Sequence, residues 1–292
     1  MHALFLTLPL LAGAPPDEQG TPSPAADALV IVVMDPLAKP LSCPCVEGYA
    51  QRDYDRLGAF LSKRMGRPVA VHYSDSLVKA MKAKTGGKAD VVIGKKSVVE
   101  YDAKRVKKGL NAVAALTNKE GETSQHGLIV VPSGDPAKTV KDLKGYRIIF
   151  GNKEADEKHA AALALLSKNG VEAPKTLETC DGCADGATKI LDAGPSSRGA
   201  AVISSYAAPL LEGCGTVKKG ALRVVGKTDP VPFVVAFVSD DLSTPDREAV
   251  RKGLLAVQDE PALCLALETL GFSAIDAPKG KPEAAVETAK KN

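Results

Sequence analysis

Runs of apolar residues alternate with amphipathic segments along most of the chain. The apolar runs at residues 28–34 (ALVIVVM), 68–73 and 89–93 have the continuous hydrophobicity of strands that are buried on both faces. The segments between them, residues 49–65 and 74–84, carry apolar side chains at helical spacing and predict two helices. Strands that alternate with helices pair in parallel through right-handed crossovers. This part of the sequence therefore predicts an α/β lobe.

Two more apolar strands lie far apart, at residues 127–132 (GLIVVP) and 232–239 (PFVVAFVS). The segment between them holds a second set of alternating elements: a strand at 146–150, a helix ending at 169–170, a helix at 187–193 and a strand at 199–204. After the second apolar strand, residues 244–259 and 261–270 predict two closing helices. We therefore expect a second α/β lobe inserted into the first.

Residues 142–171 form the most informative unit of the second lobe. A turn leads into the strand at 146–150, a break at Gly151 and Asn152 follows, and an Ala/Leu-rich helix ends at Gly170. A strand–loop–helix unit directs backbone N–H groups and the positive end of a helix toward its loop, which is a common way to bind an anion. Gly151, Asn152 and Lys153 are the candidate residues of such a site.

Composition and charge exclude several functions. The 292 residues carry a formal net charge of +3 with only 4% aromatics, and no basic stripe is interleaved with aromatic residues, so we expect no nucleic-acid partner. We find no Ser-His-Asp arrangement, paired catalytic carboxylates, P-loop or dinucleotide fingerprint, and four histidines leave little room for a His-rich metal centre. The protein is therefore not expected to be an enzyme or to carry a resident cofactor.

Both ends of the chain differ from the rest. Residues 1–14 contain an apolar core of about ten residues ending in Ala-Gly-Ala, which suits a secretory signal better than a membrane span of about 20 residues. Residues 15–27 are rich in Pro, Ser, Gly and Ala and predict a flexible leader, and the lysine-rich residues 279–292 predict a disordered tail. We expect export to the periplasm as a soluble protein.

Several motifs, in order, resemble the periplasmic substrate-binding proteins of type II fold, in the phosphate/phosphite/phosphonate-binding branch that serves ABC importers. The motifs are the helix at 49–65, KADVVIG at 88–94, LKGYRIIFG at 143–151, LLSKNGV at 165–171, the segments at 192–194 and 199–202, and the helices at 254–271. The resemblance covers roughly residues 28–278.

This resemblance implies two lobes that close over a small ligand at a hinge, and an ABC permease in the membrane as partner. Lobe one would comprise residues 28–120 and 229–278, and lobe two residues 121–228. The two crossovers of the hinge are expected near residues 117–125 and 226–232. We expect a monomer.

The resemblance also places candidate ligand-binding residues at three points. The loop after the third strand holds Gly94, Lys95, Lys96 and Ser97, whose lysines favour an acidic ligand or partner, although the loop could equally be a solvated basic surface. His126 in the first crossover could face the cleft or be structural. Ser204, Ser205 and Tyr206 end the last strand of lobe two and keep the small hydroxyl groups that relatives present to a ligand.

The loop after Gly151 departs from the pattern of phosphonate binders, which place a cluster of Ser and Thr there. This chain has Asn152, Lys153 and the acids Glu154, Asp156 and Glu157 in place of the hydroxyls. The favoured interpretation is that these acids cap the following helix. The alternative is that Lys153, Lys158 or His159 contacts an anion.

Four of the six cysteines form two close pairs, Cys43/Cys45 and Cys180/Cys183, in loops that the fold would open toward the cleft. Four thiolates could hold zinc or copper, but disulfides are favoured in an exported protein, and a redox pair is also open. Cys180-x-x-Cys183 is followed by Ala184, not His, so haem attachment is not supported. We expect Cys214 and Cys264 to be buried apolar residues or to form a further disulfide.

The sequence thus predicts an exported solute-binding component of an ABC importer that captures a small phosphate- or phosphonate-like anion by hinge closure. The alternative is a periplasmic accessory protein with the same fold and a cysteine-based metal or redox site, as in the solute-binding-like proteins that accompany quinoprotein dehydrogenases.

Overall fold

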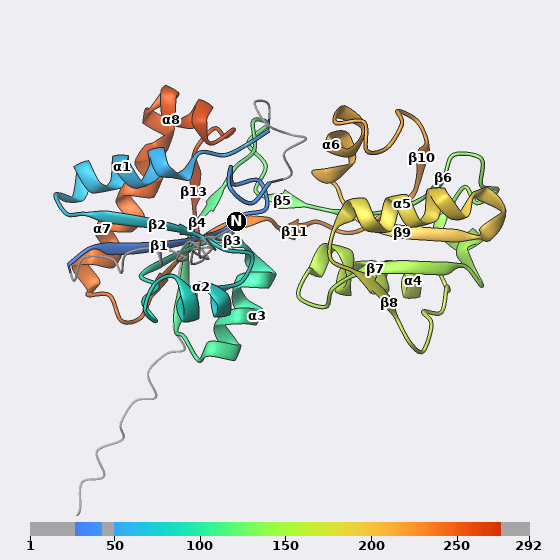
Figure 1. Ribbon diagram of the computed structural model, residues 1–292, viewed down its shortest axis with the longest axis horizontal. Coiled ribbons are helices and arrows are strands. Elements are labelled where there is room, and N and C mark those ends of the chain that lie inside the picture. Colours follow the sequence, from blue (N-terminus) through green and yellow to red (C-terminus); the bar gives the residue numbers. More distant parts are fainter. Residues whose placement is uncertain (1–26, 43–49, 276–292) are drawn as a thin grey trace, which may run out of the picture.

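A computed structural model describes residues 27–42 and 50–275, which form two α/β lobes joined by two crossing segments (Figure 1). The predicted signal peptide, most of the predicted leader, the predicted tail, Cys43 and Cys45 lie outside the described residues. Within the described ranges, no helix is long and apolar enough to cross a membrane.

Lobe one is built on a six-stranded sheet with the strand order β13-β4-β12-β3-β1-β2. Its strands are β1 (Leu29–Met34), β2 (Val69–Tyr73), β3 (Val91–Lys95), β4 (Leu110–Leu116), β12 (Val234–Ser239) and β13 (Phe272–Ala274). β1 pairs in parallel with β2 and β3, as predicted, whereas β12 lies antiparallel between β3 and β4. The sheet is mixed because the chain re-enters lobe one from the hinge, at the end of the sheet where β3 finishes.

Helices cover both faces of this sheet: α1 (Tyr54–Met65), α2 (Leu77–Ala83), α3 (Lys96–Val106), α7 (Thr244–Leu255) and α8 (Pro261–Ala266), with a 3-10 turn, η5 (Ala256–Asp259). β1 explains why: Leu29, Ile31 and Val33 belong to the core beneath α1 and α7, while Val32 and Met34 belong to the core beneath α2 and α3. Alternate side chains thus enter two cores, so the whole strand is apolar.

Two predicted boundaries in lobe one are wrong. α1 begins at Tyr54 rather than at residue 49, because the Asp53 carboxylate caps it by accepting a hydrogen bond from the Arg56 N–H at 3.3 Å. The segment predicted as a loop after the third strand is regular: β3 continues through Lys95, and α3 begins at Lys96.

Lobe two is built on a five-stranded sheet with the order β10-β6-β9-β7-β8. Its strands are β6 (Gly127–Pro132), β7 (Arg147–Gly151), β8 (Glu178–Cys180), β9 (Gly199–Ser204) and β10 (Leu222–Lys227). Its helices are α4 (Ala160–Lys168), α5 (Cys183–Ala193) and α6 (Ala207–Gly213), with 3-10 turns η2 (Val140–Leu143), η3 (Asp156–Lys158) and η4 (Pro195–Ser197).

Here too the helix starts differ from those predicted. A 3-10 turn, η3, interrupts the segment after Gly151, so the regular helix α4 begins only at Ala160. α5 begins at Cys183 rather than at residue 187, which puts that thiol in the first helical turn.

The hinge consists of β5 (Ser124–Gln125) and β11 (Val231–Pro232), which pair antiparallel between the lobes (Figure 1). Both predicted crossovers are confirmed. The predicted fold class, a two-lobed α/β protein with the second lobe inserted into the first, is confirmed as well.

A buried polar cluster closes the end of β1 that faces lobe two. Asp35 accepts hydrogen bonds from Arg52 Nη1 at 2.9 Å and from the Tyr54 hydroxyl at 2.6 Å. Burial alone would lower the pKa of Arg52, but attraction to Asp35 outweighs it and raises that pKa above its ordinary value. The Arg52 guanidinium also lies over the Phe233 ring, 5.6 Å from its centroid. These contacts fix the chain between β1 and α1.

We expect Arg52→Met to lower the free energy of unfolding by about 3–5 kcal/mol, because it leaves the Asp35 carboxylate buried without its counter-charge. Arg56→Met is the matched control, since the Arg56 side chain is 65% exposed beside Asp53 and should cost at most about 1 kcal/mol. Urea denaturation of both variants measures the difference. Equal losses would contradict the assignment of the cluster as a structural anchor.

Candidate functional site between the lobes

Three charged and polar side chains from the two lobes meet in the buried contact between them. Lys95, the last residue of β3, forms an ion pair through Nζ with Oε1 of Glu157, which lies on η3. Ser204, the last residue of β9, donates its hydroxyl to the same Oε1 at 2.6 Å. Lys95 is 8% exposed, and Glu157 and Ser204 are fully buried. One carboxylate oxygen thus receives donors from both lobes.

Two glycines allow η3 to lie this close to the sheet of lobe two. A Cβ atom on Gly127 would overlap the carbonyl oxygen of Glu157, and one on Gly151 would stand 2.5 Å from Cβ of Lys158. Any larger residue would therefore push η3 away from β6 and β7. The position of the Glu157 carboxylate therefore depends on glycine at both positions.

Ser97, at the start of α3, adds a second contact between the lobes. Its hydroxyl donates to the carbonyl oxygen of Glu154 at 2.7 Å and accepts from the Asp156 N–H at 3.3 Å. Lys96 instead pairs with Glu100 on its own helix, with Nζ 2.6 Å from Oε1. Gly94 packs inside the sheet against Met34 of β1. Of this predicted group, Lys95 and Ser97 face lobe two.

The other residues predicted in the loop after Gly151 bind elsewhere in the protein. Asn152 donates to Oδ1 of Asp181 at 2.5 Å, and the Lys153 ammonium lies 5.3 Å from the centroid of the Tyr101 ring. Lys158 and His159, the alternative contacts, bind backbone oxygens: Lys158 Nζ donates to the Asp181 carbonyl at 3.0 Å, and His159 Nδ1 lies 2.8 Å from the Gly151 carbonyl. None of these contacts involves the Lys95–Glu157 pair.

The prediction that the acids of this loop cap the following helix is wrong. α4 has no acidic residue in its first turn and no side-chain hydrogen bond at its N-cap, His159. Glu157 instead turns into the contact between the lobes, because Lys95 and Ser204 offer charge-assisted hydrogen bonds in a buried setting.

The Glu157 carboxylate is held in its charged form. Burial raises its pKa, but attraction to Lys95 and the hydrogen bonds from Lys95 and Ser204 together lower it below the ordinary value of 4.5. Its second oxygen, Oε2, is buried and has no hydrogen-bond partner among the described residues. Lys95 and Ser204 thus share one oxygen of the carboxylate.

Tyr206 separates this pair from a cavity on the hinge side. Its ring stacks on Phe233, with centroids 4.9 Å apart, and its pKa is raised by burial and by the nearby Cys183 and Glu157. The cavity of about 480 Å³ is lined from both lobes and the hinge by residues that include Arg52, Gln125, His126, Ser205, Tyr206 and Phe233. Nε of Arg52 and Oε1 of Gln125 are buried there without a partner in the described chain.

His126 and Ser205 hold each other at the wall of this cavity. The Ser205 N–H donates to the His126 carbonyl at 2.8 Å, and the His126 N–H donates to the Ser205 hydroxyl at 3.1 Å. His126 Nδ1 lies 2.8 Å from the carbonyl of Thr228 in the second crossover. These contacts link both crossovers to the end of β9.

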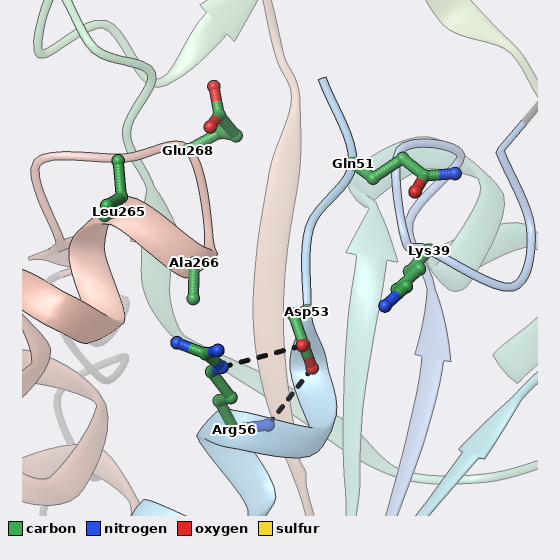
Figure 2. Close-up of a pocket in the computed structure, with 7 residues that line it drawn as sticks. All are labelled: Lys39, Gln51, Asp53, Arg56, Leu265, Ala266 and Glu268. Carbon is green, nitrogen blue, oxygen red and sulfur yellow. Dashed lines mark hydrogen bonds and ion pairs between the residues drawn. The ribbon is translucent and has the colours of Figure 1, made fainter. Parts of the chain in front are cut away.

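A second hollow, of about 300 Å³, lies on lobe one between the start of α1 and α8 (Figure 2). One of its two acids, Asp53, is engaged by Arg56, both through the backbone N–H and through the guanidinium at 3.7 Å. The hollow is therefore lined by a helix cap and belongs to lobe one alone.

Cys180 and Cys183 do not pair with each other. Cys183 lies beside the ion pair, since its sulfur accepts the Ser204 N–H at 3.3 Å, whereas the Cys180 thiol donates to the Gly182 carbonyl at 3.2 Å. Both are free thiols, so neither forms the favoured disulfide. Burial raises the pKa of Cys180. Within residues 27–42 and 50–275, no three His, Cys, Asp or Glu side chains converge in a way that could hold a metal.

Sequence reasoning missed several residues of this region. Asp35 and Arg52 flank the segment that the sequence predicts only as a loop with cysteines, Gln125 ends the hinge strand β5, and Phe233 directly follows the hinge strand β11. The sequence predicts Glu157 only as a cap of the following helix. The signal that could have found Glu157 is the replacement of hydroxyl residues by acids after the strand that ends at Gly151. Such a replacement indicates that a carboxylate of the chain lies where relatives bind an anion.

The fold and the site define a two-lobed protein with a polar binding region between its lobes and a hinge behind it, which is the arrangement of a solute-binding protein. The family "ABC transporter, phosphonate, periplasmic substrate-binding protein" matches residues 48–281, and the chain belongs to this family. The predicted family is therefore confirmed, and the protein is a solute-binding component of an ABC importer. No curated protein matches the sequence.

Solved structures share the fold at low sequence identity. XAC2383 from Xanthomonas citri, bound to ATP, aligns with a TM-score of 0.63 at 16% identity, over 86% of this chain and 92% of that chain. The binding protein component of an ABC phosphonate transporter from Pseudomonas aeruginosa aligns with a TM-score of 0.61 at 12% identity, over 85% and 82%. PhnD1 from Prochlorococcus marinus, in complex with methylphosphonate, gives 0.60 at 12% identity, over 86% and 93%.

The charge state of Glu157 makes stability depend on pH in a defined direction. Because its folded pKa lies below the ordinary 4.5, the pair contributes fully above that pH and loses its contribution as the pH falls through the folded pKa. We expect the free energy of unfolding to fall in this acid range, by up to about 1.4 kcal/mol per pH unit for this one proton.

Urea denaturation at neutral pH and at acid pH tests this dependence. In Glu157→Gln the acid-dependent loss should shrink relative to the wild type, whereas in Asp156→Asn, an exposed neighbour on the same turn, it should remain. An unchanged slope in Glu157→Gln would show that folding does not shift the pKa of this carboxylate, which would contradict a stabilising pair with Lys95.

Proposed function

We propose that this protein captures a small oxyanion of the phosphate or phosphonate type between its lobes, in the periplasm and as a monomer, and delivers it to an ABC permease. The observation that carries the proposal is the convergence of Lys95 and Ser204, from opposite lobes, on one oxygen of a carboxylate. An oxygen of a phosphonate is the same kind of acceptor, and it can take the same charge-assisted hydrogen bonds.

The donors of the site are also divided between the lobes, as expected for a ligand that holds two lobes together. Each lobe alone offers only one of the two donors, so an oxyanion gains both bonds only when the lobes are together. The narrow β5–β11 ladder lets the lobes move relative to each other. A family relative with the same fold, PhnD1 from Prochlorococcus marinus, is described in complex with methylphosphonate, which supports a ligand of this class.

We expect isothermal titration calorimetry to detect binding of methylphosphonate, phosphite or phosphate. Lys95→Met should weaken that binding at least about tenfold, because a buried charge-assisted hydrogen bond to the oxyanion is lost. Lys96→Met is the matched control, since Lys96 pairs with Glu100 on the surface of α3, and it should bind like the wild type. The absence of binding to all three anions would refute the oxyanion ligand.

Cys183 favours a second candidate function, an accessory protein with a thiol-based metal or redox site. Its sulfur accepts the backbone N–H of Ser204, so a reactive thiol would lie directly beside the ligand-binding residues. This candidate requires that Cys43 and Cys45, which lie outside the described residues, contribute further sulfur ligands for zinc or copper.

Thiol counting and metal analysis of the purified, exported protein separate the two functions. For a transport protein we expect Cys180 and Cys183 to react with a thiol reagent after unfolding in the absence of reductant, with no bound metal. Stoichiometric zinc or copper that is lost in Cys183→Ser would favour the accessory function instead.

A further inference from the structure

The carboxylate of Glu157 occupies both donors of the proposed oxyanion site. We propose that Glu157 is a built-in competitor of the ligand, which sets the affinity of the site and restricts it to tetrahedral oxyanions that carry more charge than a carboxylate. This inference rests on the proposed function, because it assumes that the ligand uses Lys95 and Ser204.

The geometry of the pair supports competition rather than a shared site. Lys95 and Ser204 both bind Oε1 of Glu157, and the carboxylate is fully buried. A ligand oxygen that bound the same two donors would have to stand where Oε1 stands. The ligand therefore binds only to molecules in which the Glu157 carboxylate has left Lys95 and Ser204. Its apparent dissociation constant equals the intrinsic one divided by the fraction of such molecules.

The competitor is tethered, which determines the kind of ligand that can replace it. A tethered carboxylate has an effective local concentration of at least about millimolar, so a free monocarboxylate, which forms the same bonds, gains nothing by exchange. A doubly charged phosphonate carries three oxygens and more negative charge. It can hold Lys95 and Ser204 and still accept further donors, so an oxyanion of this kind has an advantage over Glu157 that a monocarboxylate lacks.

The unpaired oxygen of Glu157 is consistent with a carboxylate that occupies the place of the ligand and leaves when the ligand binds. Oε2 is buried without a hydrogen-bond partner among the described residues. A buried carboxylate with a purely structural role is expected to satisfy both oxygens. A group that must leave when ligand arrives has fewer bonds to break.

Calorimetry on the full chain tests the competitor directly. We expect Glu157→Gln to bind methylphosphonate at least about tenfold more tightly than the wild type, because the neutral amide is a weaker rival for the Lys95 ammonium. Asp156→Asn removes the same charge from an exposed position of the same turn and should leave the affinity unchanged. Glu157→Asp has a side chain that is one methylene shorter, and its affinity for methylphosphonate should lie between those of the wild type and Glu157→Gln. This variant replaces Glu157→Gln if Glu157→Gln does not fold.

Competition between acetate and methylphosphonate in a rescued variant gives a second readout that a merely structural residue would not move. In Glu157→Ala the place of the carboxylate is empty, so acetate should raise the melting temperature of this variant and compete with methylphosphonate. In the wild type acetate should do neither.

The outcomes separate this inference from the proposed function. Equal binding of methylphosphonate by the wild type and Glu157→Gln, or an equal gain in Asp156→Asn, overturns the competitor and leaves the oxyanion function standing. A failure of the wild type and of every Glu157 variant to bind any of the oxyanions overturns both.

Discussion

The contact between the lobes depends on one buried ion pair, Lys95 with Glu157. Two charges removed from water are stable only when they are close and well hydrogen-bonded, so their surroundings are tightly constrained. Gly127 and Gly151 let the turn that carries Glu157 approach the sheet, and Ser204 supplies the second donor. Strand ends in both lobes must therefore meet within hydrogen-bonding distance, which ties the position of each lobe to that of the other.

A second buried pair, Asp35 with Arg52, gives the region a balanced charge. Lys95 and Arg52 each have an acid beside them, and Tyr206 stacks on Phe233 toward the hinge. A site of this kind does not attract anions through a net positive field. Under the proposed function, it recognises an anion by exchange of partners, in which a ligand replaces an acid that the chain already provides.

The fold was predictable because its signals are local and repeated. β1 is apolar throughout since its side chains enter two cores, and the motif around Phe150 and Gly151 marks the entry to lobe two. The site was less predictable, because it depends on pairs from distant parts of the chain. Nothing near Glu157 in the sequence indicates that its partner is Lys95 rather than the end of α4. The starts of α1 and α5 were misplaced for a similar reason: Asp53 and Gly182 set them by geometry that hydrophobic spacing does not encode.

The hinge has a consequence for how fast the protein can respond. β5 and β11 pair over only two residues each, and one further backbone hydrogen bond, from the Phe233 N–H to the Thr123 carbonyl at 2.9 Å, continues the pairing. Few hydrogen bonds in the hinge change when the lobes move apart. The barrier to opening therefore lies in the contact between the lobes, where the pair of Lys95 and Glu157 and the hydrogen bonds of Ser97 to Glu154 and Asp156 must separate before the empty protein samples its open form.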